Sequence, residues 1–278
     1  MSSKSDQRHR PHRPRRGHPP SPTGAASAKR RWKLKLLLGL GSIASAAWFG
    51  AQFWRESGEK SANLPSLPPA TRGSTPSTPP TGRPKPEVQA FNARVNRGNE
   101  LLAQGKPTEA VQVLTEAAQL NPEDEDVHYD LGLALARLGK PEEAIQQYEK
   151  ALSIFPNYVE AHNNLGNLLM RNGQIEEAIK HFEAAIKIMP EYASAHNNLG
   201  TAFQRTGRTN EAIIHFREAV RINPDYWEAH FNVATSCLQS GRFDEARNEL
   251  EAVLRLQPNF QPARDALAEL KTRSAAAR

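Results

Sequence analysis

The feature that most constrains the fold of this chain is an internal repeat of 34 residues. Prolines recur at that spacing at Pro122, Pro156, Pro190, Pro224 and Pro258. Glycines keep the same register at Gly105, Gly139, Gly173, Gly207 and Gly241, and a Glu-Ala pair begins four residues after each of them. Several columns that hold one register without an insertion predict an array of similar units, in which each unit packs on its neighbours.

Each unit carries apolar residues at helical spacing in two stretches, separated by the recurring glycine. In residues 159–192 the stretches are Leu165, Leu168 and Leu169, then Ile175, Ala178, Ile179, Phe182, Ala185 and Ile186. This pattern predicts two antiparallel helices with a glycine turn between them and a proline in the connection to the next unit. Gly166 lets the two helices approach closely, and we expect the rings of Tyr148, Phe182 and Phe216 to fill the space between units.

At these positions the chain resembles the tetratricopeptide repeat family, through Leu165-Gly166, Ala178, Phe182, Ala185 and Pro190. The resemblance implies an all-α fold, a right-handed α-solenoid of five helix pairs that ends in a C-terminal capping helix. The five repeats are expected at 91–124, 125–158, 159–192, 193–226 and 227–260, and the capping helix with its tail at 261–278. The helix AHNNLG at 161–166 and 195–200 is also similar to the repeats of eukaryotic O-linked N-acetylglucosamine transferase, whose catalytic domain has no counterpart here.

The residues before the repeats are a different kind of polymer. Residues 1–35 hold 11 Lys and Arg against one Asp, whereas residues 91–278 carry 20 basic and 26 acidic residues. The composition predicts a disordered basic tail at 1–35. The tail is interpreted as the charge that orients a membrane segment or as a patch for anionic lipid; a nucleic-acid arm is the disfavoured alternative.

An uncharged stretch at 36–54 follows the tail and predicts one transmembrane signal-anchor helix. Its 19 residues would span about 28 Å, which is close to the thickness of a bilayer. Basic residues precede it, so the N-terminus is expected in the cytoplasm and the repeats outside, in the periplasm if the protein is bacterial. The alternative is a signal peptide cleaved near Ala44-Ser45-Ala46, which would release a secreted protein. Residues 55–90 are rich in proline and predict an extended linker.

The first helix of each repeat carries a polar column that predicts a peptide-binding groove. It consists of Asn96, Asp130, Asn164, Asn198 and Asn232, with Asn163, Asn167 and Asn197 beside it. An amide side chain both donates and accepts hydrogen bonds, so a row of amides suits the backbone of an extended peptide. The alternative is that these asparagines join neighbouring helices within the array. A second column, Arg137, Arg171 and Arg205, either binds acidic side chains of a partner or stabilises helix C-termini.

Other chemically interesting residues receive structural interpretations. His128, His162, His196 and His230 recur at 34 residues and are expected to pack in place of an aromatic residue rather than to bind metal. Cys237 lies on the apolar face of its helix and is expected to be buried. Because no phosphate loop, dinucleotide fingerprint or zinc-protease motif occurs, no catalytic residue, cofactor or metal is assigned.

The predicted function is therefore that of a membrane-anchored scaffold or adaptor, which binds a protein or an extended peptide in its concave groove. The first alternative is a targeting or regulatory subunit for a separately encoded peptide-modifying enzyme, such as a glycosyltransferase. The second is a tether to nucleic acid or anionic lipid through residues 1–35.

Overall fold

The computed structural model describes residues 86–276, and every regular element among them is an α-helix. The eleven helices of this region are α3 (Pro86–Ala103), α4 (Pro107–Leu120), α5 (Glu125–Arg137), α6 (Pro141–Ile154), α7 (Val159–Arg171), α8 (Ile175–Ile188), α9 (Ala193–Arg205), α10 (Thr209–Ile222), α11 (Trp227–Gln239), α12 (Phe243–Leu256) and α13 (Gln261–Ala276). The tetratricopeptide-like pattern of five helix pairs followed by one further helix is confirmed for these residues.

The turn inside each pair forms because glycine accepts a left-handed backbone. All five turn glycines have positive φ, from 69° at Gly105 to 81° at Gly173. In the turn after α7, the Gly173 amide donates to the carbonyl of Met170 at 3.2 Å, and the Gln174 amide donates to that of Leu169 at 2.9 Å. These two bonds satisfy carbonyls at the end of α7 and reverse the chain into α8.

Within each pair the helices approach closely at a small residue. A Cβ atom at Gly166 of α7 would lie 2.6 Å from Cε1 of Phe182 on α8, and Gly132 stands in the same relation to Tyr148 at 2.7 Å. Our expectation had placed such rings between repeats, whereas the structure places each against the glycine of its own repeat. The correction follows from the spacing, because the ring lies 16 residues after the glycine and so on the antiparallel partner helix.

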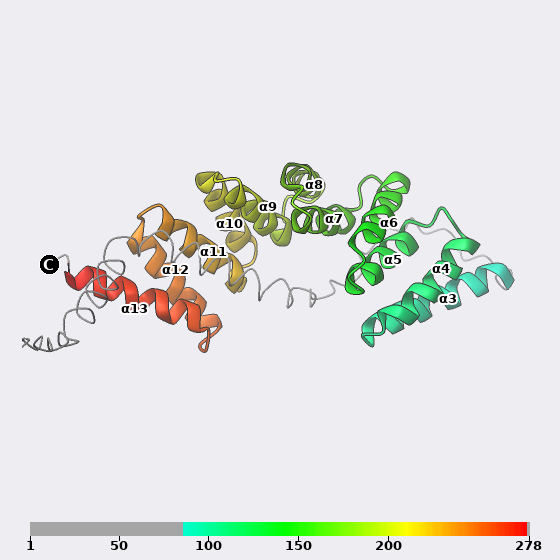
Figure 1. Ribbon diagram of the computed structural model, residues 1–278, viewed down its shortest axis with the longest axis horizontal. Coiled ribbons are helices and arrows are strands. Elements are labelled where there is room, and N and C mark those ends of the chain that lie inside the picture. Colours follow the sequence, from blue (N-terminus) through cyan, green and yellow to red (C-terminus); the bar gives the residue numbers. More distant parts are fainter. Residues whose placement is uncertain (1–85, 277–278) are drawn as a thin grey trace, which may run out of the picture. The chain divides into compact units, whose positions relative to one another are not determined.

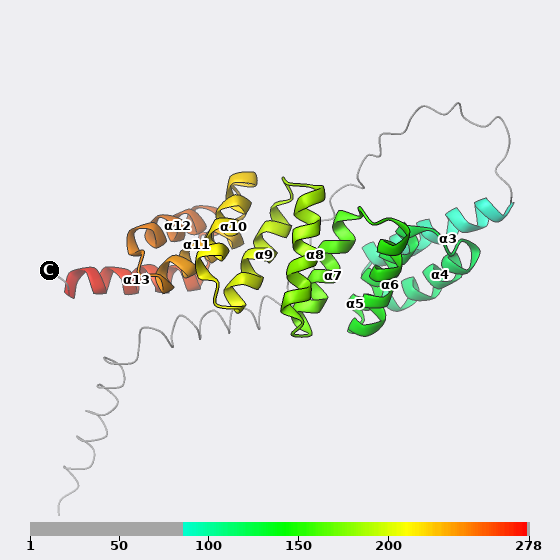
Figure 2. The same ribbon diagram turned by 90° about the horizontal axis from the view of Figure 1, so that it is seen from above.

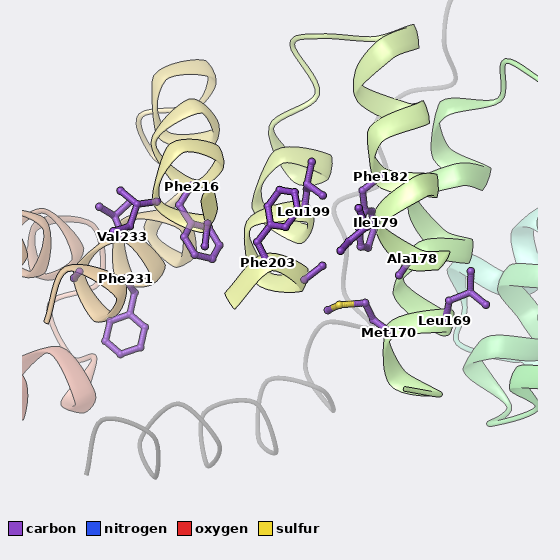
Figure 3. Packing of buried hydrophobic residues seen from close by; sticks show 14 of the residues in the cluster. Leu169, Met170, Ala178, Ile179, Phe182, Leu199, Phe203, Phe216, Phe231 and Val233 are labelled. Carbon is purple, nitrogen blue, oxygen red and sulfur yellow. The ribbon is translucent and has the colours of Figure 1, made fainter. Parts of the chain in front are cut away.

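Successive pairs pack in sequence order, the second helix of one pair lying against the first helix of the next (Figure 1). A view from above shows the same order (Figure 2). The first helices α7 and α9, and likewise α9 and α11, also contact each other directly. Buried apolar side chains form one cluster from Leu135 to Leu270 and another from Leu101 to Ala134. Figure 3 shows Phe182 of α8 and Leu199 of α9 within the larger cluster.

Two boundaries differ from the sequence-based expectation. Helix α3 begins at Pro86, inside the segment that composition assigned to the linker, because proline fits the first helical position and Glu87 lies in the first turn. Helix α13 reaches Ala276. The predicted tail at 1–35, the predicted membrane helix at 36–54 and the linker up to residue 85 lie outside the described residues. Among residues 86–276, none of the helices combines the length and the apolar character needed to span a bilayer.

Candidate functional site

The predicted asparagine column is hydrogen-bonded from repeat to repeat. The Nδ2 of Asn198 donates to Oδ1 of Asn163 at 2.9 Å, and that of Asn232 donates to Oδ1 of Asn197 at 2.9 Å. In the same geometry, Nδ2 of Asn164 donates to the hydroxyl oxygen of Tyr129 at 3.0 Å. We call these three bonds the amide ladder. They engage the donor groups of one column with the preceding repeat, as the structural interpretation of the column requires.

The ladder leaves one buried donor without a partner. Asn163 is completely buried, and its Nδ2 has no hydrogen-bond partner among the described residues. In the next repeat, the equivalent Asn197 also bonds to the hydroxyl of Tyr226. Asn163 lacks the corresponding bond to Tyr192, whose pKa is raised to about 12, chiefly by burial and then by the charge of Glu160. An unsatisfied buried amide is costly, so this group favours an added acceptor.

Asn167 and Arg171 continue from Asn163 along the same face of α7. The three residues follow at intervals of four, so their side chains lie on one side of the helix. Asn167 is half-buried and Arg171 exposed, and neither has a side-chain hydrogen bond or ion pair within the described region. We call Asn163, Asn167 and Arg171 the α7 stripe. Its polar groups are not used by the array.

The corresponding face of α9 differs because its polar groups are engaged. Asn197 belongs to the amide ladder, and the Thr201 hydroxyl donates to the Asn197 carbonyl at 3.0 Å. Arg205 Nη1 donates to the Met170 carbonyl at the end of α7 at 2.9 Å. The comparison singles out α7 as the first helix with polar groups left for a ligand.

The arginine column has two different members. Arg137 Nη1 donates to the carbonyl of Leu102 at 2.8 Å, as Arg205 does to that of Met170, so each binds the C-terminal turn of the preceding first helix. Cations at helix C-termini are stabilising. The sequence pattern treated Arg171 as equivalent, but within the described region it makes no such bond.

The N-terminal end of the polar column is acidic. Burial raises the pKa of Asp130 to about 7, with smaller contributions in the same direction from Asp126 and Asp124. A hydrogen bond from Asn99 and the charge of Arg137 act in the opposite direction. Further toward the terminus, Asn96 is exposed and extends the column onto α3.

A row of tyrosines at the end of each repeat was missed by the sequence-based interpretation. The Tyr158 hydroxyl donates to Oδ1 of Asp126 at 2.9 Å, and its ring stacks on that of Tyr129 with centroids 4.9 Å apart. The Tyr226 hydroxyl bonds to Ser194 and Asn197. The spacing of 34 residues between Tyr158, Tyr192 and Tyr226 was the available signal.

The histidine column joins the two helices of each repeat and the loop before it. Each Nε2 lies 3.0 Å from a proline carbonyl oxygen six residues earlier, as in the pair His162 and Pro156. Each Nδ1 contacts a side chain 19 residues later; these partners are Gln147, His181, His215 and Glu249. Among the described residues, no group of three or more His, Cys, Asp or Glu side chains is arranged to hold a metal ion. Cys237 is buried, as predicted.

Stacked helix pairs with a polar first-helix face define an α-helical repeat protein whose chemistry lies on its surface. Family models described as tetratricopeptide repeat match residues 95–159, 158–225 and 203–270. Residues 95–270 are therefore tetratricopeptide repeats, as the resemblance implied.

Solved structures of similar fold come from several proteins. MamA from Desulfovibrio magneticus RS-1, residue 41 to its end, is 25% identical with a TM-score of 0.57, over 62% of this chain and 97% of that one. PilF from Pseudomonas aeruginosa is 22% identical with a TM-score of 0.57, over 68% and 92%. YrrB, described as a TPR protein with an unusual peptide-binding site, is 19% identical with a TM-score of 0.55, over 66% and 97%. No curated protein matches the sequence.

Proposed function

We propose that this protein is a scaffold that binds an extended segment of a partner protein along the face of its first helices, centred on α7. The α7 stripe is the observation that carries the proposal. Asn163 presents a buried amide donor without a partner, and Asn167 and Arg171 have no side-chain bonds within the described region. Polar groups that an array leaves unused on one helix face, while the next helix uses its own, support a site for a ligand.

The chemistry of the stripe indicates what the partner segment contains. An amide donates and accepts hydrogen bonds, so Asn167 suits a peptide group of an extended backbone. The guanidinium of Arg171 suits a carboxylate, which it can bind through two parallel hydrogen bonds. We therefore expect a segment with an Asp or Glu side chain next to the backbone that contacts Asn167. The printed description of YrrB, a similar fold that binds a peptide, agrees with this class of ligand.

Site-specific photo-crosslinking in intact cells tests the proposal. A photoreactive residue at Arg171 should capture a partner, whereas the same residue at Ile214, which is 64% exposed on the second helix α10, should not. Mass spectrometry of the captured complex then identifies the partner segment. Capture at both positions to the same extent would count against the first-helix face.

A matched pair of substitutions separates binding from stability. Arg171→Ala should reduce partner capture from a reporter at Thr235 of α11 by about tenfold or more, the effect expected for loss of a charge-assisted bond. Arg137→Ala should lower stability, because it removes the bond to Leu102. If Arg171→Ala lowered stability and left capture unchanged, the arginine would be structural after all.

We further propose that the repeats are anchored to a membrane by residues 36–54, with the N-terminus in the cytoplasm. The uncharged 19-residue stretch and the basic residues before it support this. Protease added outside intact spheroplasts should digest the repeats and leave residues 1–35 intact. Digestion only after lysis would contradict the topology, and release of soluble repeats that lack residues 36–54 would indicate a cleaved signal peptide.

A further inference from the structure

Repeats 3 and 4 each contain a pair of histidines in direct contact. Nδ1 of His162 on α7 lies 2.9 Å from Nδ1 of His181 on α8, and Nδ1 of His196 on α9 lies 3.2 Å from Nδ1 of His215 on α10. These two histidine pairs link the first and second helix within their repeats. At the equivalent position, repeat 2 has Gln147 and repeat 5 has Glu249.

The hydrogen-bond partners fix where protons sit in the neutral pairs. Nε2 of His162 contacts the carbonyl oxygen of Pro156 at 3.0 Å, and a carbonyl oxygen only accepts, so this nitrogen carries hydrogen. Nδ1 of neutral His162 is then an acceptor, and His181 must donate to it through its own Nδ1. Because Pro190 holds His196 in the same way, His215 is the donor in the second pair.

One further proton can be accommodated in each pair, but a second cannot. If Nδ1 of His162 becomes protonated, His181 can accept from it once its own hydrogen moves to Nε2. When both rings are charged, two N–H groups face each other about 3 Å apart. The hydrogen bond is then lost and two like charges repel at short range.

The surroundings of the second-helix histidines also oppose a charge. The pKa of His181 is lowered, first by burial and then by His162, with Lys180 in the same direction and Glu177 opposing. The pKa of His215 is lowered by burial and then by His196, while Glu211 and Glu218 oppose the change. None of these acting charges comes from α9 in the first case or from α11 in the second, although both helices pack against the pair in question.

Repeat 5 has the opposite design at the same position. His230 contacts the carbonyl oxygen of Pro224 through Nε2 and a carboxylate oxygen of Glu249 through Nδ1, at 3.0 and 2.6 Å. Both partners accept, so both nitrogens donate and the ring is held as a cation. Accordingly the pKa of His230 is raised, chiefly by the bond to Glu249.

We propose that the two histidine pairs form an acid-sensitive element that loosens repeats 3 and 4 selectively when the pH falls below the range of free histidine. His181 and His215 bind protons more weakly in the folded array than in the unfolded chain. Their contribution to stability is therefore complete above about pH 6.5, the pKa of an unfolded histidine, and is lost as the pH falls below that value. Repeats 2 and 5 lack such a pair, so acid opens the middle of the array before its ends.

Amide hydrogen exchange of the full chain, followed by mass spectrometry, tests this. Between pH 7.5 and 5.0, after correction for the intrinsic chemical rate, exchange in α7–α10 should rise about tenfold more than in α5 and α6, the factor that corresponds to one pKa unit. The double variant His181→Gln, His215→Gln copies the natural partner in repeat 2 and should lose this excess. Glu249→Gln at the same helix position should leave the excess in α7–α10 unchanged.

Two further measurements cover the outcomes. Gln147→His should build a third pair and extend the acid response to α5 and α6. Exchange of the imidazole C2 hydrogens in the unaltered chain should report pKa values below 6.5 for His181 and His215, and needs no variant to fold. A uniform rise across all repeats, an excess that survives in the double variant, or pKa values at or above 6.5 would each overturn the proposal.

Discussion

The Nδ2 of Asn198 donates to Oδ1 of Asn163, 2.9 Å away in the preceding repeat, and so joins two first helices through their side chains. Because Asn163 is completely buried, this bond is formed away from water, and its acceptor has no solvent to replace it.

Substitution of Asn198 by Ala should therefore destabilise the array. It leaves both polar groups of Asn163 without partners, which costs about 1–3 kcal/mol for a buried group. Urea unfolding followed by circular dichroism measures the change. Asn167→Ala is the control, since Asn167 has no side-chain bond within the described residues, and it should stay within about 0.5 kcal/mol of the unaltered chain.

Gly166→Ala should be destabilising, by about 1–3 kcal/mol, because the added Cβ would lie 2.6 Å from the ring of Phe182. Repeat 5 offers a rescue, since it carries Ala234 and Leu250 at the equivalent positions and both are buried. The double variant Gly166→Ala, Phe182→Leu should recover part of the loss in thermal unfolding. No recovery would show that the ring has a role beyond contact with this glycine.

Gly173→Ala isolates the cost of the left-handed turn from any clash. No atom outside the immediate neighbours lies within 4 Å of the added Cβ, but φ is +81°. We expect a loss of about 1 kcal/mol in the free energy of unfolding, from the backbone conformation alone. Gly173→Asn should cost less, because asparagine enters this conformation more readily. Equal costs for the two variants would contradict a conformational cause.

The His230 and Glu249 pair should stabilise repeat 5 at low rather than high pH. The pKa of His230 is raised above its unfolded value, so its contribution is complete below about pH 6.5 and is lost as the pH rises through the folded value. Glu249→Gln should remove this dependence and return the pKa of His230 toward its ordinary range. Titration of the His230 C2 hydrogen checks the change, with His128 beside Gln147 as the internal reference.

The sequence was sufficient to predict the helix pairs, the glycine turns and the close approach at Gly166, because each depends on residue types at fixed spacing within one repeat. It could not predict the amide ladder. The bonds of the ladder join residues 35 apart in neighbouring repeats, and their geometry depends on how far one repeat is rotated on the next. For the same reason Arg171 and Arg205 look equivalent in sequence, although only Arg205 reaches the carbonyl at the end of the preceding first helix.

Asp130 occupies the asparagine column in repeat 2, and its pKa of about 7 makes it a mixed group. In a population of molecules at neutral pH, roughly half carry a protonated carboxyl, which offers a donor and an acceptor as an amide does. The other half carry a negative charge at the same place. The N-terminal end of the column is thus two chemical surfaces in exchange, and a ligand with a cationic residue there selects one of them, whereas Asn232 at the other end offers a single surface at every physiological pH.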